Sequence, residues 1–131
     1  MDKNNLIKEM IIKQIPNVTP NIKLYYKDIQ RIVKNLNTSI FDNSNCSIWS
    51  GSVTNIHNKN KGCYINFFLN KKKRALHRIL YNNYIGKLHD HEYIKYICTN
   101  KGICCNIYHL LKINPEVDNQ TEINNISITN N

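Results

Sequence analysis

Alanine, glycine and proline are scarce in this chain of 131 residues, and long apolar runs are missing. Ala75 is the only alanine, beside four glycines and three prolines. The lack of a run of about 20 apolar residues excludes a membrane-spanning helix. The first residues lack a basic stretch followed by an apolar segment, so no signal peptide is expected. We therefore expect an intracellular protein of a reducing compartment, in the cytoplasm or the nucleus.

Acidic side chains are also few. The chain has 9 acidic and 18 basic residues and a formal net charge of +9. Such a balance favours a polyanionic partner, and nucleic acid is the usual one. Alternatively, the lysines follow from codon usage, because Asn, Ile, Lys and Tyr dominate as they do in AT-rich genomes, including those of many large DNA viruses. The composition thus also predicts a viral origin and a virus-infected cell.

Five cysteines stand out against these scarcities. In a reducing compartment, clustered cysteine and histidine residues indicate metal ligands rather than disulfides. Cys98, Cys104 and His109 lie close together, with Lys101 and Gly102 forming a turn between the cysteines. Zinc takes thiolate and imidazole ligands in a tetrahedron, and short spacings let one loop supply most of them. The spacing predicts a zinc-stapled loop, which in a small basic protein favours nucleic acid as the partner.

The length of the chain predicts a single domain, and the apolar spacing predicts that it contains both helices and strands. Helical periodicity and stop signals predict helices at 6–15, 19–36, 75–85 and from 114 onward. Aromatic and β-branched residues predict strands at 63–69 and 93–97. A basic turn is expected at 70–74. We divide the chain into an N-terminal helical segment (1–37), a zinc-binding domain (38–120) and a flexible tail (121–131).

Four short patterns follow one another between residues 46 and 110. They are Cys46-x-x-Trp49-x-Gly51, Gly62-Cys63-Tyr64-x-x-Phe67, Ala75-x-His77-Arg78-x-x-Tyr81 followed by Gly86, and Cys98, Cys104, Asn106 and His109-Leu110. In order and spacing this set resembles the zinc-containing HNH branch of the His-Me finger (ββα-metal) endonucleases, which includes homing endonucleases. The resemblance covers about half of the chain. It implies an α+β fold with a ββα core, a structural zinc loop and added N-terminal helices.

The resemblance also implies a ligand set for the zinc. Cys98, Cys104 and His109 match three of the family's ligands, and Cys46 matches the upstream fourth. Cys63 and Cys105 are the alternatives for the fourth position. Four protein ligands leave no open coordination position, so this zinc would hold the fold and would take no part in chemistry.

One position departs from the family's pattern. The catalytic histidine of the family lies two residues before the first loop cysteine and takes a proton from the attacking water. Tyr96 occupies that position here. Free tyrosine titrates near pH 10 and is a poor base at neutral pH, and losing a general base typically costs a factor of about 10² to 10⁴. The substitution therefore predicts that DNA cleavage is weak or lost. Alternatively, His89 or His91 could replace the missing histidine as the general base.

The remaining family positions concern phosphate and a second metal. His77 and Arg78 match a His-Arg pair near the scissile phosphate, and we expect a structural His77 and a DNA-facing Arg78. Asp118 and Asn119 fall where the family places its metal-binding asparagine, and either could hold Mg²⁺ through oxygen.

Three functions follow from these features. The first is a protein that binds double-stranded DNA on a degenerate HNH fold. The second is an active Mg²⁺-dependent HNH endonuclease, and the third is a zinc-stapled protein-interaction module. A homodimer would fit the homing relatives. The expected nucleic-acid contacts are Lys71, Lys72, Lys73, Arg74 and Arg78.

Overall fold

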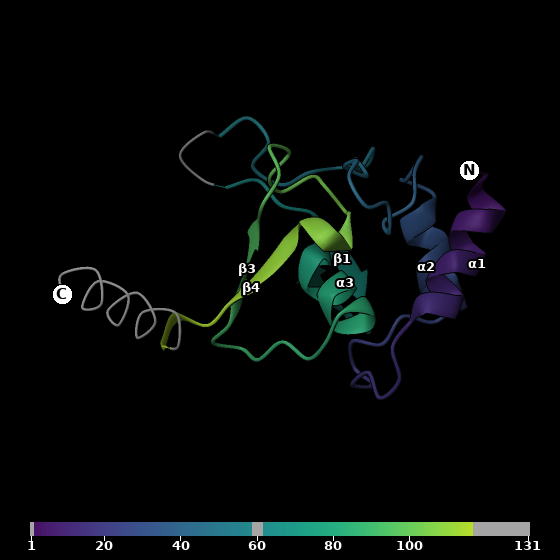
Figure 1. Ribbon diagram of the computed structural model, residues 1–131, viewed down its shortest axis with the longest axis horizontal. Helices are drawn as coiled ribbons and strands as arrows, with labels where there is room; N and C mark the ends of the chain where they lie inside the picture. The colour runs from purple at the N-terminus through teal and green to yellow at the C-terminus, as the bar shows by residue number, and fades with distance from the viewer. Residues whose placement is uncertain (1, 59–61, 117–131) are drawn as a thin grey trace.

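Three α-helices and two small antiparallel sheets form the mixed α/β fold of residues 2–58 and 62–116, the part of the chain that the computed structural model describes (Figure 1). In Figure 1, two helices lie at one end, a third helix lies in the middle, and a β-hairpin lies on its far side. The elements are α1 (Lys3–Lys13), α2 (Tyr26–Val33), β1 (Asn66–Leu69), β2 (Lys72–Ala75), α3 (Leu76–Tyr84), β3 (Tyr93–Tyr96), the 3-10 turn η1 (Ile107–His109) and β4 (Leu110–Ile113).

The helices α1 and α2 pack side by side, and polar groups fix their ends. The Asp2 carboxylate accepts a hydrogen bond from the backbone nitrogen of Asn5 and caps the start of α1. The Lys3 ammonium donates to the carbonyls of Val33, Lys34 and Leu36 at distances of 3.0, 2.9 and 2.7 Å. A cation at this place satisfies carbonyls that have no partner within α2 and complements the negative end of the helix dipole.

The second helix begins later than its sequence suggests. The prediction placed its start at Thr19 and Pro20, but those residues belong to a turn, closed by a hydrogen bond from the Ile22 nitrogen to the Thr19 carbonyl. The Asp28 carboxylate instead accepts from the Tyr25 nitrogen at 2.9 Å and sets the start of α2 at Tyr26. The predicted start was wrong because a side-chain cap competed with the proline signal.

The strands β1 and β2 form a hairpin that the sequence did not predict. Residues 70–74 were expected to be a basic turn, but only Asn70 and Lys71 make the turn, with φ angles of 50° and 66°. Leu69 pairs with Lys72 and Phe67 with Arg74. Two left-handed residues suit the tight turn of a hairpin, so the chain reverses at once and the basic residues continue as a strand.

The other predicted elements agree with the structure to within a few residues. The helix predicted at 75–85 is α3, and the strand predicted at 93–97 is β3. Beyond β4, the Asn114 side chain accepts from the Glu116 nitrogen at 3.2 Å, as a helix cap would. The rest of that expected helix, with the tail, lies outside the described residues.

One apolar core joins the N-terminal helices to β1 and α3. Its most buried members include Met10, Ile29, Ile32, Leu76 and Ile79. The N-terminal helices therefore help to bury the apolar face of α3. Among the described residues, no helix has both the length and the apolar character needed to cross a membrane.

Asn83 is a polar residue within this core, and it is fully buried. Its side-chain oxygen accepts from the Gln14 amide at 2.8 Å and from the Leu24 nitrogen at 2.9 Å. Its amide nitrogen donates to the carbonyls of Ile22 (2.9 Å) and Ile79 (2.8 Å). All four hydrogen-bonding positions of this amide are used, so it fastens α3 to the segment between α1 and α2.

The strands β3 and β4 form the second hairpin, which carries the candidate site. Tyr93 pairs with Ile113, and Tyr96 pairs with Leu110. The loop between the strands contains Cys98 and Cys104, and η1 leads directly into β4. The hairpin packs on α3 through a small apolar cluster formed by Tyr81, Leu88 and Leu110, with Ile94 and Tyr96 beside it.

Candidate metal centre

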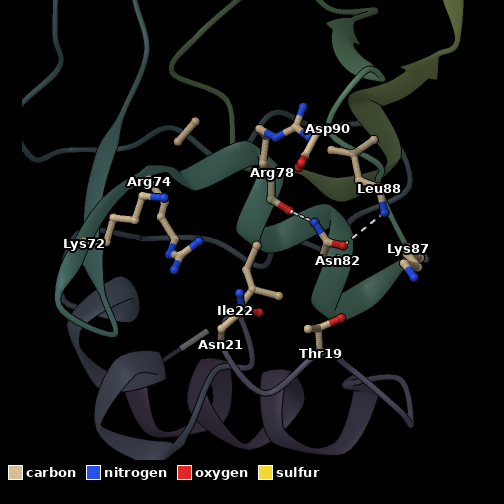
Figure 2. Close-up of a pocket in the computed structure, with 11 residues that line it drawn as sticks. Thr19, Asn21, Ile22, Lys72, Arg74, Arg78, Asn82, Lys87, Leu88 and Asp90 are labelled. Carbon is tan, nitrogen blue, oxygen red and sulfur yellow. Dashed lines mark hydrogen bonds between the residues drawn. The ribbon is translucent and has the colours of Figure 1, made fainter.

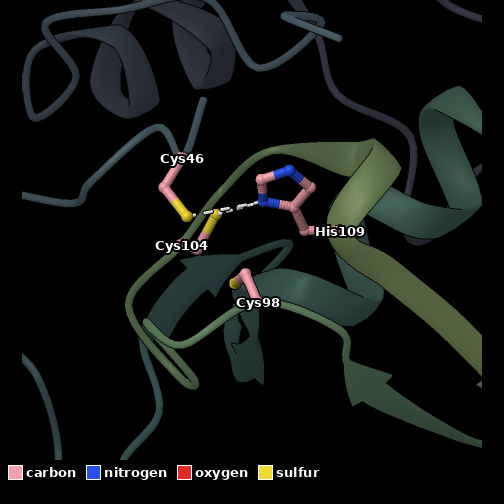
Figure 3. A group of neighbouring side chains, drawn as sticks. All are labelled: Cys46, Cys98, Cys104 and His109. Carbon is pink, nitrogen blue, oxygen red and sulfur yellow. Dashed lines mark hydrogen bonds between the residues drawn. The ribbon is translucent and has the colours of Figure 1, made fainter. Parts of the chain in front are cut away.

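Four side chains from distant parts of the chain meet at the loop between β3 and β4 (Figure 3). The sulfur atoms of Cys46, Cys98 and Cys104 and a ring nitrogen of His109 all lie within 4.8 Å of one another. Cys46 comes from the segment before β1, whereas the other three come from the loop and η1. The structure therefore brings together the four ligands predicted from the sequence, and the group could hold a metal ion.

The spacing of the donor atoms fits a tetrahedral ion. The Nδ1 atom of His109 lies 3.4 Å from the Cys46 sulfur and 3.5 Å from the Cys104 sulfur. Zinc bonds of about 2.3 Å to sulfur and 2.0–2.1 Å to nitrogen would separate these atoms by about 3.6 Å in a tetrahedron. Three thiolates and one imidazole are the donors that zinc accepts in closed structural sites. The donor set therefore fits zinc, with Nδ1 as the histidine ligand atom.

The thiols of the group differ in how readily they ionise. Burial raises the pKa of Cys104 to about 12. Burial also opposes ionisation of Cys46, but hydrogen bonds from Asn100, Cys104 and Cys98 lower its pKa on balance. A metal dication would deprotonate a coordinating thiol outright and so reverse the effect of burial on Cys104.

The backbone around Cys46 is tied to the loop by hydrogen bonds. The Cys105 nitrogen donates to the Ser47 carbonyl at 2.7 Å, and the Trp49 nitrogen donates to the Ile103 carbonyl at 3.0 Å. Ile48 also forms a β-bridge with Cys104. The ligands are thus held close to one another by the backbone itself, which reduces the ordering that metal binding would require.

Asn106 links the segment that precedes Cys46 to the loop that carries Cys104. The residue is fully buried, and its amide donates to the carbonyls of Asp42 and Asn45, each at 2.7 Å. Its side-chain oxygen accepts from the Tyr108 nitrogen at 2.9 Å and caps η1. Its backbone nitrogen donates to the Cys104 sulfur at 3.4 Å, an interaction that would favour a thiolate there.

Gly102 allows the loop to close. Its φ angle is +85°, and a Cβ atom placed on it would lie only 2.1 Å from the Cys63 carbonyl oxygen. Only glycine suits this left-handed conformation and this close approach. The sequence indicated a turn at this residue, but the contact with Cys63 depends on the tertiary structure.

The two alternative cysteines are not members of the group of four. The Cys63 thiol donates to the Lys101 carbonyl at 3.3 Å. The Cys105 side chain is buried within the apolar core, where burial raises its pKa. Cys46, and neither of these two, completes the group that could hold a metal ion.

Tyr96 lies at the end of β3 and packs against His77 of α3. The ring centroids are 5.7 Å apart with an angle of 62° between the planes. Burial raises the pKa of Tyr96 above its ordinary value. Burial, aided by the charge of Arg78, lowers the pKa of His77 to about 4. His77 Nδ1 is buried and has no hydrogen-bond partner among the described residues.

Arg78 is directed toward the turn before β3. Its guanidinium donates to the carbonyls of Glu92 (2.7 Å) and His89 (3.1 Å), and so it braces this turn. His89 and His91 stack in the turn, with their ring centroids 5.8 Å apart. Asp118 and Asn119, the predicted Mg²⁺ ligands, lie outside the described residues.

Comparisons with known proteins give a viral relative and no family. The chain is 51% identical over 111 residues to an uncharacterized protein of Acanthamoeba polyphaga mimivirus. The match covers 85% of this chain but only 32% of the relative, so the chain spans about a third of that protein's length. No family model and no solved structure matches the chain. The viral relative agrees with the viral origin and the virus-infected cell that the amino-acid composition predicts.

Proposed function

We propose that the protein binds nucleic acid, most simply double-stranded DNA, on a degenerate HNH fold whose cleavage activity is weak or lost. The observation that carries the proposal is Tyr96, which stands two residues before the first cysteine of the candidate metal centre, where the HNH pattern has its catalytic histidine. Zinc held by the four-residue group would be structural, because three cysteines and one histidine fill the tetrahedron.

The order of elements supports this assignment. A ββα-metal core consists of an antiparallel hairpin followed by a helix, and the resemblance places the zinc ligands between the strands. Here β3 and β4 pair antiparallel, with Cys98 and Cys104 in the loop between them. The capped turn at Asn114 follows β4 directly.

The surroundings of Tyr96 argue against cleavage. A general base works best with a pKa near the working pH. Burial raises the pKa of Tyr96, so its hydroxyl stays protonated at neutral pH and can only donate a proton or a hydrogen bond. The neighbouring His77, with a pKa of about 4, is neutral but weakly basic. Neither group is suited to take a proton from water, and this supports a loss of about 10² to 10⁴ in rate.

The charge supports the binding part of the proposal. A net charge of +9 on 131 residues attracts a polyanion, and binding through phosphate contacts would weaken steeply with salt. The basic strand β2 begins with Lys72, Lys73 and Arg74, which are three of the expected nucleic-acid contacts.

The test combines binding with cleavage. Binding of the zinc-loaded protein to a labelled DNA duplex should be measured over a series of salt concentrations, beside plasmid nicking with Mg²⁺ or Mn²⁺. We expect salt-dependent binding, no nicking by the wild type, and nicking by Tyr96→His. Tyr93→His, on the same strand and exposed, is the matched control and should stay silent.

The outcomes separate the alternatives. Nicking by the wild type, lost in Asp118→Ala or Asn119→Ala, would establish an active Mg²⁺-dependent endonuclease. A lack of binding to DNA or RNA at low salt would instead favour a zinc-stapled protein-interaction module.

A further inference from the structure

A basic pocket, lined by none of the four candidate metal ligands, lies between α3, β2 and the turns at 19–22 and 87–90 (Figure 2). Its volume is about 370 Å³. A smaller cavity of about 200 Å³ adjoins it and shares Thr19, Asn82 and Lys87 with it. The charged side chains that line the pocket are Lys72, Arg74, Arg78, Lys87 and Asp90.

The positive charge of the pocket is largely uncompensated. Four basic side chains face one carboxylate, that of Asp90. The ion pairs found within 4.0 Å among residues 2–58 and 62–116 involve other cations, namely Lys13, Arg31 and Lys112. The hydrogen bonds of Arg78 and Arg74 go to neutral carbonyls, which leave the charge of each guanidinium in place. Such a concave basic site concentrates anions.

The walls of the pocket are held in position. The Asn82 amide donates to the Arg78 carbonyl at 2.8 Å, and its oxygen accepts from the Leu88 nitrogen at 3.0 Å (Figure 2). These bonds hold the segment with Lys87 against α3. The Arg78 guanidinium is itself fixed by the carbonyls of Glu92 and His89. A prearranged set of donors binds an anion at a lower entropic cost than free side chains would.

The hairpin divides the basic run of the sequence into two groups. Alternate residues of a strand point to opposite faces of a sheet. Lys72 and Arg74 therefore share one face and line the pocket, whereas Lys73 pairs with the exposed Phe68 and is not part of the lining. The four consecutive basic residues thus do not form a single surface.

We propose that this pocket binds a phosphate group, either a terminal phosphate or an in-chain phosphodiester of a nucleic acid. The proposal rests on the proposed nucleic-acid binding. Phosphate suits the site because guanidinium groups bind its oxygens through charge-assisted hydrogen bonds and lysine meets it as a point charge. The Thr19 and Asn21 side chains at the edge of the pocket add neutral polar groups.

The first experiment uses inorganic phosphate and the full-length, zinc-loaded chain. Amide NMR signals would be followed during a phosphate titration at constant ionic strength, with acetate as the comparison anion. Saturable shifts are expected for residues 19, 21, 22, 72–75 and 86–90. Lys87→Gln and Lys72→Gln, both at exposed positions, should each weaken phosphate binding by about threefold. Lys8→Gln, on the exposed side of α1, removes the same charge elsewhere and should leave the affinity unchanged.

A second experiment distinguishes the two sources of phosphate. Duplexes with 5′-phosphate and 5′-hydroxyl ends would be compared, and tighter binding of the phosphorylated ends assigns the pocket to a terminal phosphate. Equal binding, with a salt slope lowered by about one in Lys87→Gln, assigns it to the backbone.

The pocket proposal and the proposed function can fail separately. The pocket proposal is overturned if phosphate shifts no amide signals, or shifts only signals of residues outside the pocket. It is also overturned if Lys87→Gln binds phosphate as tightly as Lys8→Gln does. Phosphate binding in the pocket without any binding of DNA or RNA would overturn the proposed function and leave the phosphate site itself in place.

Discussion

The His77 ring meets the Tyr96 ring edge to face, with their centroids 5.7 Å apart. Two aromatic side chains, one from α3 and one from β3, thus pack together at the position that the resemblance aligns with the family's catalytic histidine. Tyr96→His should restore a titratable imidazole there and raise metal-dependent nicking by about 10² to 10⁴ over the wild type. Plasmid nicking measures the effect, and Tyr93→His shows whether any histidine on β3 would do the same. An equally silent Tyr96→His would argue against the resemblance at this position.

His77 should make the protein less stable in mild acid. Its folded pKa of about 4 lies below the ordinary value of 6.5, so the unfolded chain binds more protons between these values. The stability that the neutral His77 ring contributes is fully present above pH 6.5. As the pH falls toward 4, the free energy of unfolding decreases by up to about 3 kcal/mol. Urea unfolding of the wild type and His77→Phe between pH 7 and 5 checks the sign, with zinc content followed in parallel. The expected result is a flatter pH profile in the variant.

Removing one ligand of the candidate metal centre should destabilise the protein. Cys46→Ala deletes one of the four grouped ligands, whereas Cys63→Ala deletes a thiol outside the group. We expect the first variant to lose bound zinc and at least about 3 kcal/mol of stability, because metal binding and folding are coupled in small sites. Metal analysis and thermal unfolding with and without a chelator measure both effects. Loss of zinc in Cys63→Ala but not in Cys46→Ala would reverse the ligand assignment.

Gly102→Ala should disturb the loop between the ligands. Its left-handed backbone disfavours a side chain by about 1–2 kcal/mol, and the new methyl group would collide with the Cys63 carbonyl. Gly86→Ala is the matched control, since a Cβ atom there meets nothing within 4 Å. Denaturant unfolding should show a loss of more than about 2 kcal/mol for the first variant and a small change for the second.

Asn83→Leu should destabilise the protein by more than about 3 kcal/mol. The substitution leaves the buried Leu24 nitrogen and the Ile22 carbonyl without the partners that Asn83 supplies. Asn37→Ala, at an exposed position, should change stability by less than about 0.5 kcal/mol. Equilibrium unfolding in urea compares the two variants.

The metal centre could be predicted because its ligands carry distinctive chemistry. Three of them lie in one short segment, and the structure confirms that Cys46 joins them in a group that could hold a metal ion. The helices and the strand β3 could likewise be predicted from local periodicity, whereas its partner β4 was not among the expected strands. These features depend on neighbouring residues, which a single sequence displays directly.

The missed features depend on contacts between distant segments. A run of lysine and arginine has little tendency to form a strand, and β2 exists because the Asn70–Lys71 turn pairs it with β1. The four hydrogen bonds of Asn83 reach residues as far as 69 positions away. The basic pocket likewise assembles residues from several elements, so the sequence revealed its charge but not its shape.

A metal bound by both Cys46 and His109 would link two residues that are 63 positions apart in the chain and so close a long loop. A metal there would act as a reversible cross-link that restricts the unfolded chain, much as a disulfide does, but one that also persists under reducing conditions. Each tenfold change in free metal above the dissociation constant would then change the folding free energy by about 1.4 kcal/mol. The amount of folded protein would therefore follow the supply of free metal, and competition for the metal would limit how much of it accumulates.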